Sequence, residues 1–383
     1  MAQRRLTVVQ LLPALESGGV ERGTLEVAAA LITAGHRSIV VSAGGRLVEA
    51  LTAAGSEHVA LPAGRKSLLT LLQVRKLRRL LREQGVDILH ARSRMPAWIA
   101  WLAWRGLPAT DRPRFITTVH GLYSVNRYSA IMTHGERVIA VSDTARDYIL
   151  DNYPDVDPRR IVTIYRGVDR NEFPYGYKPD AAWLAAWYAD YPYLQGRRVL
   201  TLPGRLTRLK GHEDFIELVA ALVNRGLDVH GLIVGHLDPA RQAYINELER
   251  RIADRGLGDR ITLTGLRQDI RDIYAVSDIV LSLSNKPESF GRTVLEPLCM
   301  GVPAVGYDHG GVGEVLDALY PQGKVRRGDA GLLLERTAQL IETPQPVPES
   351  RAYTLDAMLV QTLDLYRDLA ADNAPAPAGR DAH

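Results

Sequence analysis

The chain has 383 residues, of which 46% are hydrophobic and 24% charged, and its formal net charge at pH 7 is +3. This length predicts two domains, and so small a positive charge argues against a nucleic-acid-binding protein. A single cysteine, Cys299, excludes an internal disulfide and fits a reducing compartment. No apolar run is long enough to span a bilayer and the first residues do not resemble a signal peptide, so we expect a cytoplasmic location.

The first half of the chain alternates predicted strands and helices. A strand over residues 6–12 leads into a glycine turn, a helix that ends near Gly35, and a second strand over residues 38–42. Further strands are predicted at residues 86–90, 115–119, 138–141 and 161–164, and helices at 67–83 and 143–152. Because the apolar runs are continuous rather than alternating, we expect a parallel sheet covered on both faces.

The alternation stops near Asp169, where a linker and a tyrosine- and tryptophan-rich connecting helix are predicted. It then restarts with strands at residues 199–202, 229–234, 261–263, 279–282 and 304–306. The segment 354–369 has the apolar face of an amphipathic helix. The sequence therefore predicts an α/β protein with domains at 1–172 and 173–350, a final helix within 351–371 and a disordered tail at 372–383.

Two loops that follow predicted strands carry groups suited to an anion. Amides at Gly18 and Gly19 can approach a phosphate closely because glycine has no Cβ, although a plain turn explains these residues equally well. Arg205 and Lys210 follow the first strand of the second domain, where their two cationic groups can neutralise a pyrophosphate leaving group. A solvated basic loop is the alternative interpretation of that pair.

The stretch from Glu288 to Glu296 is the strongest candidate site. Two ionised carboxylates suit hydroxyl-rich groups, because each accepts hydrogen bonds from neighbouring hydroxyls. We expect Glu296 to lie where a helix begins, so that the amides of Thr293 and Val294 meet phosphate oxygens. The stretch therefore predicts a site for a sugar joined to a phosphate.

Taken in series, these motifs resemble the retaining glycosyltransferase family 4 over about residues 6 to 370. The resemblance rests on Glu288 and Glu296 together with Gly204-Arg205, Lys210-Gly211, Gly310-Gly311-Val312-Gly313-Glu314, Gly18-Gly19-Val20-Glu21, Thr118-Val119-His120-Gly121 and Val141-Ser142. That family has the GT-B fold. The resemblance thus implies two facing Rossmann-like domains, with a C-terminal helix that crosses back to the first domain.

The resemblance also implies residue roles. Glu296 would bind the ribose hydroxyls of a nucleotide, Glu288 the hydroxyls of the donor sugar, and His120 the transferred sugar or the acceptor. Arg205 and Lys210 would bind the diphosphate with amides at Gly19, Thr293 and Val294, and backbone near Arg267 would contact the base. The implied donor-binding set is Gly18, Gly19, Arg205, Lys210, Arg267, Glu288, Ser289, Phe290, Gly291, Thr293, Val294 and Glu296, and the implied catalytic set is His120, Glu288, Arg205 and Lys210.

Three arginines bear on the acceptor. Arg92 and Arg94 follow a predicted strand of the first domain and can grip an anionic acceptor, although a solvated loop explains them nearly as well. Arg166 stands where the family commonly has asparagine, which leaves the role of this loop open while adding a third candidate contact. The basic helix 67–83 either lies on anionic lipid or simply has a basic outer face.

We therefore expect a retaining glycosyltransferase that moves a sugar from a nucleoside-diphosphate donor, with uridine diphosphate (UDP) as the expected nucleotide. The acceptor is a glycan or lipid-linked molecule of bacterial surface polysaccharide or lipopolysaccharide synthesis. The histidines lack metal-ligand spacing, so no metal and no cofactor beyond the donor is expected. Two alternatives stay open: a sugar-nucleotide 2-epimerase, and a non-catalytic carbohydrate-binding protein on the same scaffold.

Overall fold

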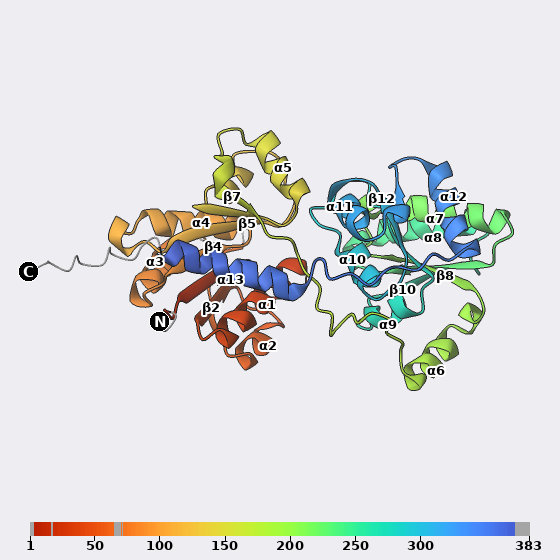
Figure 1. Cartoon of the computed structure of the whole chain (residues 1–383), viewed down its shortest axis with the longest axis horizontal. Helices are drawn as coiled ribbons and strands as arrows, with labels where there is room; N and C mark the ends of the chain where they lie inside the picture. Colours follow the sequence, from red (N-terminus) through yellow and green to blue (C-terminus); the bar gives the residue numbers. More distant parts are fainter. Residues whose placement is uncertain (1–3, 17, 65–69, 71, 372–383) are drawn as a thin grey trace, which may run out of the picture. The chain divides into compact units, whose positions relative to one another are not determined.

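The computed structural model describes residues 4–16, 18–64, 70 and 72–371 and divides into two compact units (Figure 1). The first unit is Met1–Tyr165 with Asp356–His383, and the second is Arg166–Leu355. The division at Tyr165 precedes the one expected at residue 172. The expected tail at 372–383 and part of the expected helix 67–83 lie outside the described residues.

The first unit is built on a parallel sheet of seven strands in the order β3-β2-β1-β4-β5-β6-β7. The strands are β1 (Thr7–Leu11), β2 (Arg37–Ser42), β3 (Glu57–Ala60), β4 (Ile88–Ala91), β5 (Arg114–Val119), β6 (Arg137–Ala140) and β7 (Ile161–Thr163). The central strands are buried along almost their whole length, in agreement with their continuous apolar runs.

The helices of the first unit include the last helix of the described chain. They are α1 (Gly19–Thr33), α2 (Val48–Ala53), α3 (Leu72–Glu83), α4 (Arg94–Arg105), α5 (Asp143–Asn152) and α13 (Leu355–Ala371). Helix α13 buries Met358, Leu363, Tyr366 and Leu369. The Tyr366 hydroxyl lies 2.6 Å from Nδ1 of His90 in β4, and Nε2 of the same ring lies 2.6 Å from the Thr118 hydroxyl. A buried polar chain thus fixes α13 to the first sheet.

The second unit has a parallel sheet in the order β10-β9-β8-β11-β12-β13. Its strands are β8 (Arg198–Pro203), β9 (Val229–Val234), β10 (Ile261–Gly265), β11 (Ile279–Ser282), β12 (Ala304–Tyr307) and β13 (Lys324–Val325). Its helices are α6 (Ala181–Asp190), α7 (His212–Asn224), α8 (Gln242–Asp254), α9 (Ile270–Ala275), α10 (Arg292–Cys299), α11 (Gly310–Leu319) and α12 (Ala330–Glu342). Two parallel sheets with helices confirm the expected Rossmann-like organisation.

Each sheet has a point at which the strand order reverses, between β1 and β4 in the first unit and between β8 and β11 in the second. An aspartate fixes the amino end of this junction in both units. Asp87 accepts a 2.8 Å hydrogen bond from the Thr7 amide, and Asp278 accepts one of 2.7 Å from the Val199 amide. At the opposite, carboxyl ends the loops diverge to either side, which is where open α/β sheets bind ligands.

Candidate functional site

The reversal point of the second sheet brings the two main candidate motifs together. Arg205 and Lys210 follow β8, and Glu288 follows the neighbouring strand β11. The Lys210 ammonium lies 2.7 Å from a Glu288 carboxylate oxygen, and the two side chains are 20% and 24% exposed. Arg205 is exposed in the same loop. The site therefore presents a cation and an anion side by side, each within reach of solvent.

The loop that carries Glu288 is held from several directions. The Ser284 hydroxyl donates a short hydrogen bond to the Glu288 carboxylate, while the Ser284 carbonyl lies 2.8 Å from Nε2 of His309. The Glu288 carbonyl accepts a 2.8 Å bond from the amide of Gly311, in the first turn of α11. A Cβ at Gly311 would lie 2.4 Å from the Phe290 Cα, so only glycine lets α11 approach this closely. Sequence reasoning missed Ser284, for which no local motif gives a signal.

Glu296 occupies a different position from the one expected. Helix α10 begins at Arg292, so Glu296 lies a turn inside it rather than at its start. Its carboxylate accepts a 3.0 Å bond from Nε of Arg292 and a 3.3 Å bond from the Tyr274 hydroxyl. Burial, and then the charge of Glu296, raise the pKa of Tyr274, which therefore stays a donor. Each carboxylate oxygen keeps a lone pair for a further hydroxyl.

The start of α10 also corrects one of the two amides expected to bind phosphate. The Val294 amide donates to the Gly291 carbonyl at 3.1 Å and is thus engaged within the first turn. Thr293 is the second residue of the helix, where intrahelical bonding leaves the amide to other partners. The neighbouring Phe290 is buried against the Tyr353 ring, and Ser289 is half-buried. We infer that Thr293 is the stronger of the two candidates.

Arg267 is committed to structural contacts through its side chain. Its guanidinium donates to both oxygens of Asp269, at 2.9 and 2.6 Å, and lies over the Trp187 ring of α6. The hydrogen bond to Asp269 outweighs burial and raises the pKa of Arg267 above its ordinary value, so the group stays charged. Any contact with a base at this loop thus falls to the backbone, as expected, or to the neighbouring Leu266, which is 58% exposed.

In the first unit, the candidate residues follow three adjacent strands. Gly18 and Gly19 stand at the start of α1 after β1, Arg92 follows β4, and His120 follows β5. Because the strands are parallel, these positions share the carboxyl edge of the sheet. His120 is partly buried there. The structure thus gathers these residues on one edge of the first unit.

Arg92 and Arg94 were both expected to bind an anionic acceptor, with a solvated loop as the alternative, but Arg92 does not face solvent. Its side chain is buried and donates a 2.6 Å hydrogen bond to the Gln10 side chain in β1. Arg94 lies over the Tyr123 ring at 4.6 Å and donates to the Ser129 hydroxyl at 3.3 Å, so it braces the loop that follows His120. Arg166, the first residue of the second unit, is 8% exposed.

Other reactive groups give less chemical scope. Burial, opposed by Arg170 and aided by Glu296, raises the pKa of the Cys299 thiol to about 11, so it is protonated at neutral pH. Within the described ranges, no three His, Cys, Asp or Glu side chains gather closely enough to hold a metal ion. No helix among the described residues is long and apolar enough to cross a membrane.

Comparisons with known proteins agree with this geometry. Residues 17–172 match the family Glycosyltransferase Family 4, and residues 190–354 match Glycosyl transferases group 1. The chain is 27% identical to the N-acetyl-alpha-D-glucosaminyl L-malate synthase of Bacillus anthracis over 68% of its own length and 64% of that protein. It is 33% identical to the lipopolysaccharide core biosynthesis mannosyltransferase LpsB of Rhizobium meliloti over 30% of its own length and 32% of that protein. The matches thus span less than two thirds of these curated relatives.

Solved structures extend the similarity to nearly the whole chain. A glycosyltransferase from Rickettsia africae is 29% identical and superposes with a TM-score of 0.84 over 95% of this chain and 98% of that one. Anabaena HepE, solved with UDP and glucose, is 19% identical with a TM-score of 0.78 over 94% and 99% of the two chains. The second likeness is one of fold. With both halves matched in order on two parallel sheets, the chain belongs to glycosyltransferase family 4 and has the GT-B fold.

Proposed function

We propose that the protein is a retaining glycosyltransferase that moves a sugar from a UDP-linked donor to a glycan or lipid-linked acceptor. The observation that carries the proposal is the contact between Lys210 and Glu288 at the reversal point of the second sheet. It sets an ammonium suited to a diphosphate beside a carboxylate suited to sugar hydroxyls. The fold shared with HepE, which was solved with UDP and glucose, supports the choice of nucleotide.

The chemistry of the proposal follows from these groups. Lys210 and Arg205 stabilise the negative charge that develops on the diphosphate as the bond to the sugar breaks. The acceptor oxygen attacks the same face of the sugar, and the leaving phosphate takes the acceptor's proton. Glu288 orients the sugar through its hydroxyls, Glu296 holds the ribose, and His120 contacts the sugar or acceptor. In this scheme no carboxylate becomes a covalent nucleophile, and the two cationic side chains take the place of a metal.

We also propose that the enzyme works at the inner face of the cytoplasmic membrane in surface-glycan synthesis, with an acceptor that carries negative charge. Similarity to the LpsB mannosyltransferase supports the pathway. Helix α3 exposes Arg75, Lys76, Arg79 and Arg82, and Leu72 at its start is 58% exposed. Such a face suits anionic lipid. Sedimentation with phosphatidylglycerol vesicles, compared with phosphatidylcholine vesicles, tests this; equal recovery with both would reject membrane contact.

A donor screen followed by two variants tests the transferase. Thermal unfolding with UDP-, GDP- and ADP-sugars should show the largest rise in Tm for a UDP-sugar, because a ligand that binds the folded state stabilises it. With that donor, Lys210→Ala and Glu288→Ala should each lower transfer by about 100-fold or more at unchanged Tm. Near-normal turnover in either variant would sink the assignment.

The same donor separates the alternatives. A 2-epimerase converts the donor when no acceptor is present, whereas a transferase leaves most of it intact, so a donor-only incubation distinguishes them. A carbohydrate-binding protein gives neither reaction. Transfer measured with and without EDTA tests the metal-independent scheme, which predicts equal rates.

A further inference from the structure

We propose that Arg208 is a positioning residue: its contacts with helix α8 fix the turn that holds Lys210 in place for the donor diphosphate. This inference rests on the proposed function, since it concerns how Lys210 is held for that ligand. Arg208 itself lies two residues before Lys210, in the short 3-10 turn Arg208–Lys210. It belongs to the loop between β8 and α7, and its partners come from α7, α8 and the loop after β11.

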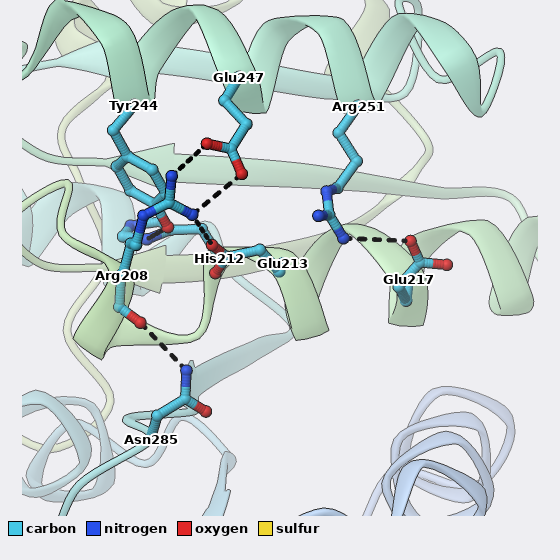
Figure 2. Close-up of polar contacts among 8 residues, drawn as sticks. All are labelled: Arg208, His212, Glu213, Glu217, Tyr244, Glu247, Arg251 and Asn285. Atoms are coloured by element: carbon cyan, nitrogen blue, oxygen red, sulfur yellow. Dashed lines mark hydrogen bonds and ion pairs between the residues drawn. The ribbon is translucent and has the colours of Figure 1, made fainter.

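The side chain of Arg208 packs against α8 (Figure 2). Its guanidinium donates to both carboxylate oxygens of Glu247, at 3.0 Å for one bond and closer for the other, and covers the Tyr244 ring at 4.9 Å. Glu213, in the first turn of α7, lies 3.7 Å away on a third side. A planar guanidinium held bidentately and stacked on a ring has one preferred orientation. The contact thus fixes the direction of the turn as well as its distance from α8.

The backbone of the same turn is held from the opposite side. Asn285, in the loop after β11, donates from its side chain to the Arg208 carbonyl at 3.1 Å (Figure 2). Its backbone amide donates to the Leu209 carbonyl at 2.8 Å. Gly211 closes the turn with φ of +72°, and a Cβ there would lie 1.9 Å from the Leu283 carbonyl oxygen. The turn before Gly211 is therefore held by hydrogen bonds on two sides, from α8 and from the loop that carries Glu288.

Lys210 is the last residue of this turn, so these contacts fix its backbone. Its ammonium sits at the end of a flexible four-carbon stem, so its reach depends on where its Cα is held. That Cα belongs to the turn, and the ammonium meets Glu288 at 2.7 Å. Arg208 is 64% exposed and Glu247 24% exposed. An exposed ion pair contributes little to overall stability, so we assign this one a role in holding the ligand-binding lysine.

The test measures UDP affinity by calorimetry in five variants of the full chain, with Tm measured on each. Arg208→Ala should raise the Kd for UDP about fivefold at unchanged Tm, which is the size of effect expected from one well-formed ion pair. Arg208→Lys should recover part of the affinity, because an ammonium can pair with Glu247 without the bidentate geometry. Arg251→Ala is the control. It removes another α8 arginine whose pairing with Glu217 at 3.9 Å does not involve the turn, and it should leave Kd unchanged (Figure 2).

The decisive comparison places Arg208→Ala in the Lys210→Ala background. If Arg208 acts through Lys210, the double variant binds UDP no more weakly than Lys210→Ala alone. Additive losses would mean that Arg208 contacts the diphosphate directly. An unchanged Kd in Arg208→Ala would mean that the contact of Arg208 with α8 does not position Lys210. Either result overturns the inference. A wild-type protein that binds none of UDP, GDP and ADP instead refutes the proposed function, and with it this role of the turn.

Discussion

Among single residues, Glu296 is a buried carboxylate held by two hydrogen-bond donors, which suits its proposed contact with the ribose hydroxyls. Arg292 and Tyr274 each occupy one carboxylate oxygen, so the group is oriented before any ligand arrives. Pre-orientation lowers the entropy lost when hydroxyls bind. The charge of the carboxylate then strengthens each new hydrogen bond.

Replacing that charge while keeping the shape gives a prediction. Glu296→Gln should raise the Kd for UDP by about tenfold, since hydrogen bonds to a charged group contribute more than those to a neutral one. Calorimetric titration with UDP measures the change. Deoxyuridine diphosphate is the matched control ligand, because it lacks one ribose hydroxyl. Equal weakening of both ligands would argue that Glu296 does not bind the ribose.

The residue scale also shows where sequence reasoning ends. Glu288 and Lys210 follow neighbouring strands, and a strand-loop pattern is visible in the sequence. Arg92 follows a strand as well, but its partner Gln10 is far away in the chain, so its burial left no local signal. Arg208 likewise depends on Glu247 in another helix. Whether an arginine is exposed at a site or bound within the fold therefore depends on partners in distant elements, which the local sequence does not show.

At the scale of elements, α13 is fixed to the first sheet by a polar chain rather than by apolar contacts alone. Tyr366, His90 and Thr118 are all buried, so each polar atom depends on the others for its hydrogen bonds. Burial raises the pKa of Tyr366, which keeps its hydroxyl protonated.

This chain predicts a measurable loss of stability. Tyr366→Phe should lower the free energy of unfolding by about 1 to 2 kcal/mol, because it removes the buried 2.6 Å hydrogen bond between the Tyr366 hydroxyl and Nδ1 of His90. Urea denaturation followed by circular dichroism measures the loss. Asp364→Ala, on the exposed side of α13, is the control and should change stability by no more than about 0.5 kcal/mol. A similar loss in both variants would show that the buried chain has no special weight.

The strands that the sequence did not predict are short or polar. Strand β3, with the sequence EHVA, is only partly buried, and β13 has two residues. Neither carries the apolar run by which the other strands were found. The aromatic segment near residue 183 was predicted as a helix and forms α6, because its tryptophans pack on the second unit's core.

At the scale of the whole molecule, two buried histidines make folding sensitive to acid. Burial, opposed by a hydrogen bond with the Thr207 backbone and aided by the charge of Lys210, lowers the pKa of His212 to about 4 from its ordinary value of 6.5. Burial lowers the pKa of His230 to about 4 as well. The unfolded chain therefore binds more protons than the folded chain between these values. The stability that these two histidines contribute is fully present above pH 6.5 and is lost as the pH drops toward 4.

The expected loss is roughly 3 kcal/mol at most from His212 by pH 4. His212→Asn cannot take up this proton. The stability difference between wild type and variant should therefore shrink as the pH falls from 7 to 4. Urea denaturation at steps of pH measures the difference. A stability difference that stays constant over this range would show that folding does not lower the pKa of His212.

Chain topology at this scale is harder to see in a sequence than fold class. Repeated strand and helix patterns predict α/β units directly. The return of residues after Asp356 to the first unit joins parts of the chain separated by the whole second unit. Only the resemblance to a family suggested it, because an amphipathic helix such as α13 does not reveal which sheet it covers.

The ion pair between Lys210 and Glu288 has a consequence for how a transferase could tell fresh donor from spent nucleotide. A nucleoside diphosphate that draws Lys210 away would leave the Glu288 carboxylate with the Ser284 hydroxyl but without the ammonium that balances its charge. An intact donor brings sugar hydroxyls that replace the lost contact. Under the proposed function, the free diphosphate is therefore expected to be the poorer ligand of the two, and re-forming the ion pair is expected to favour product release.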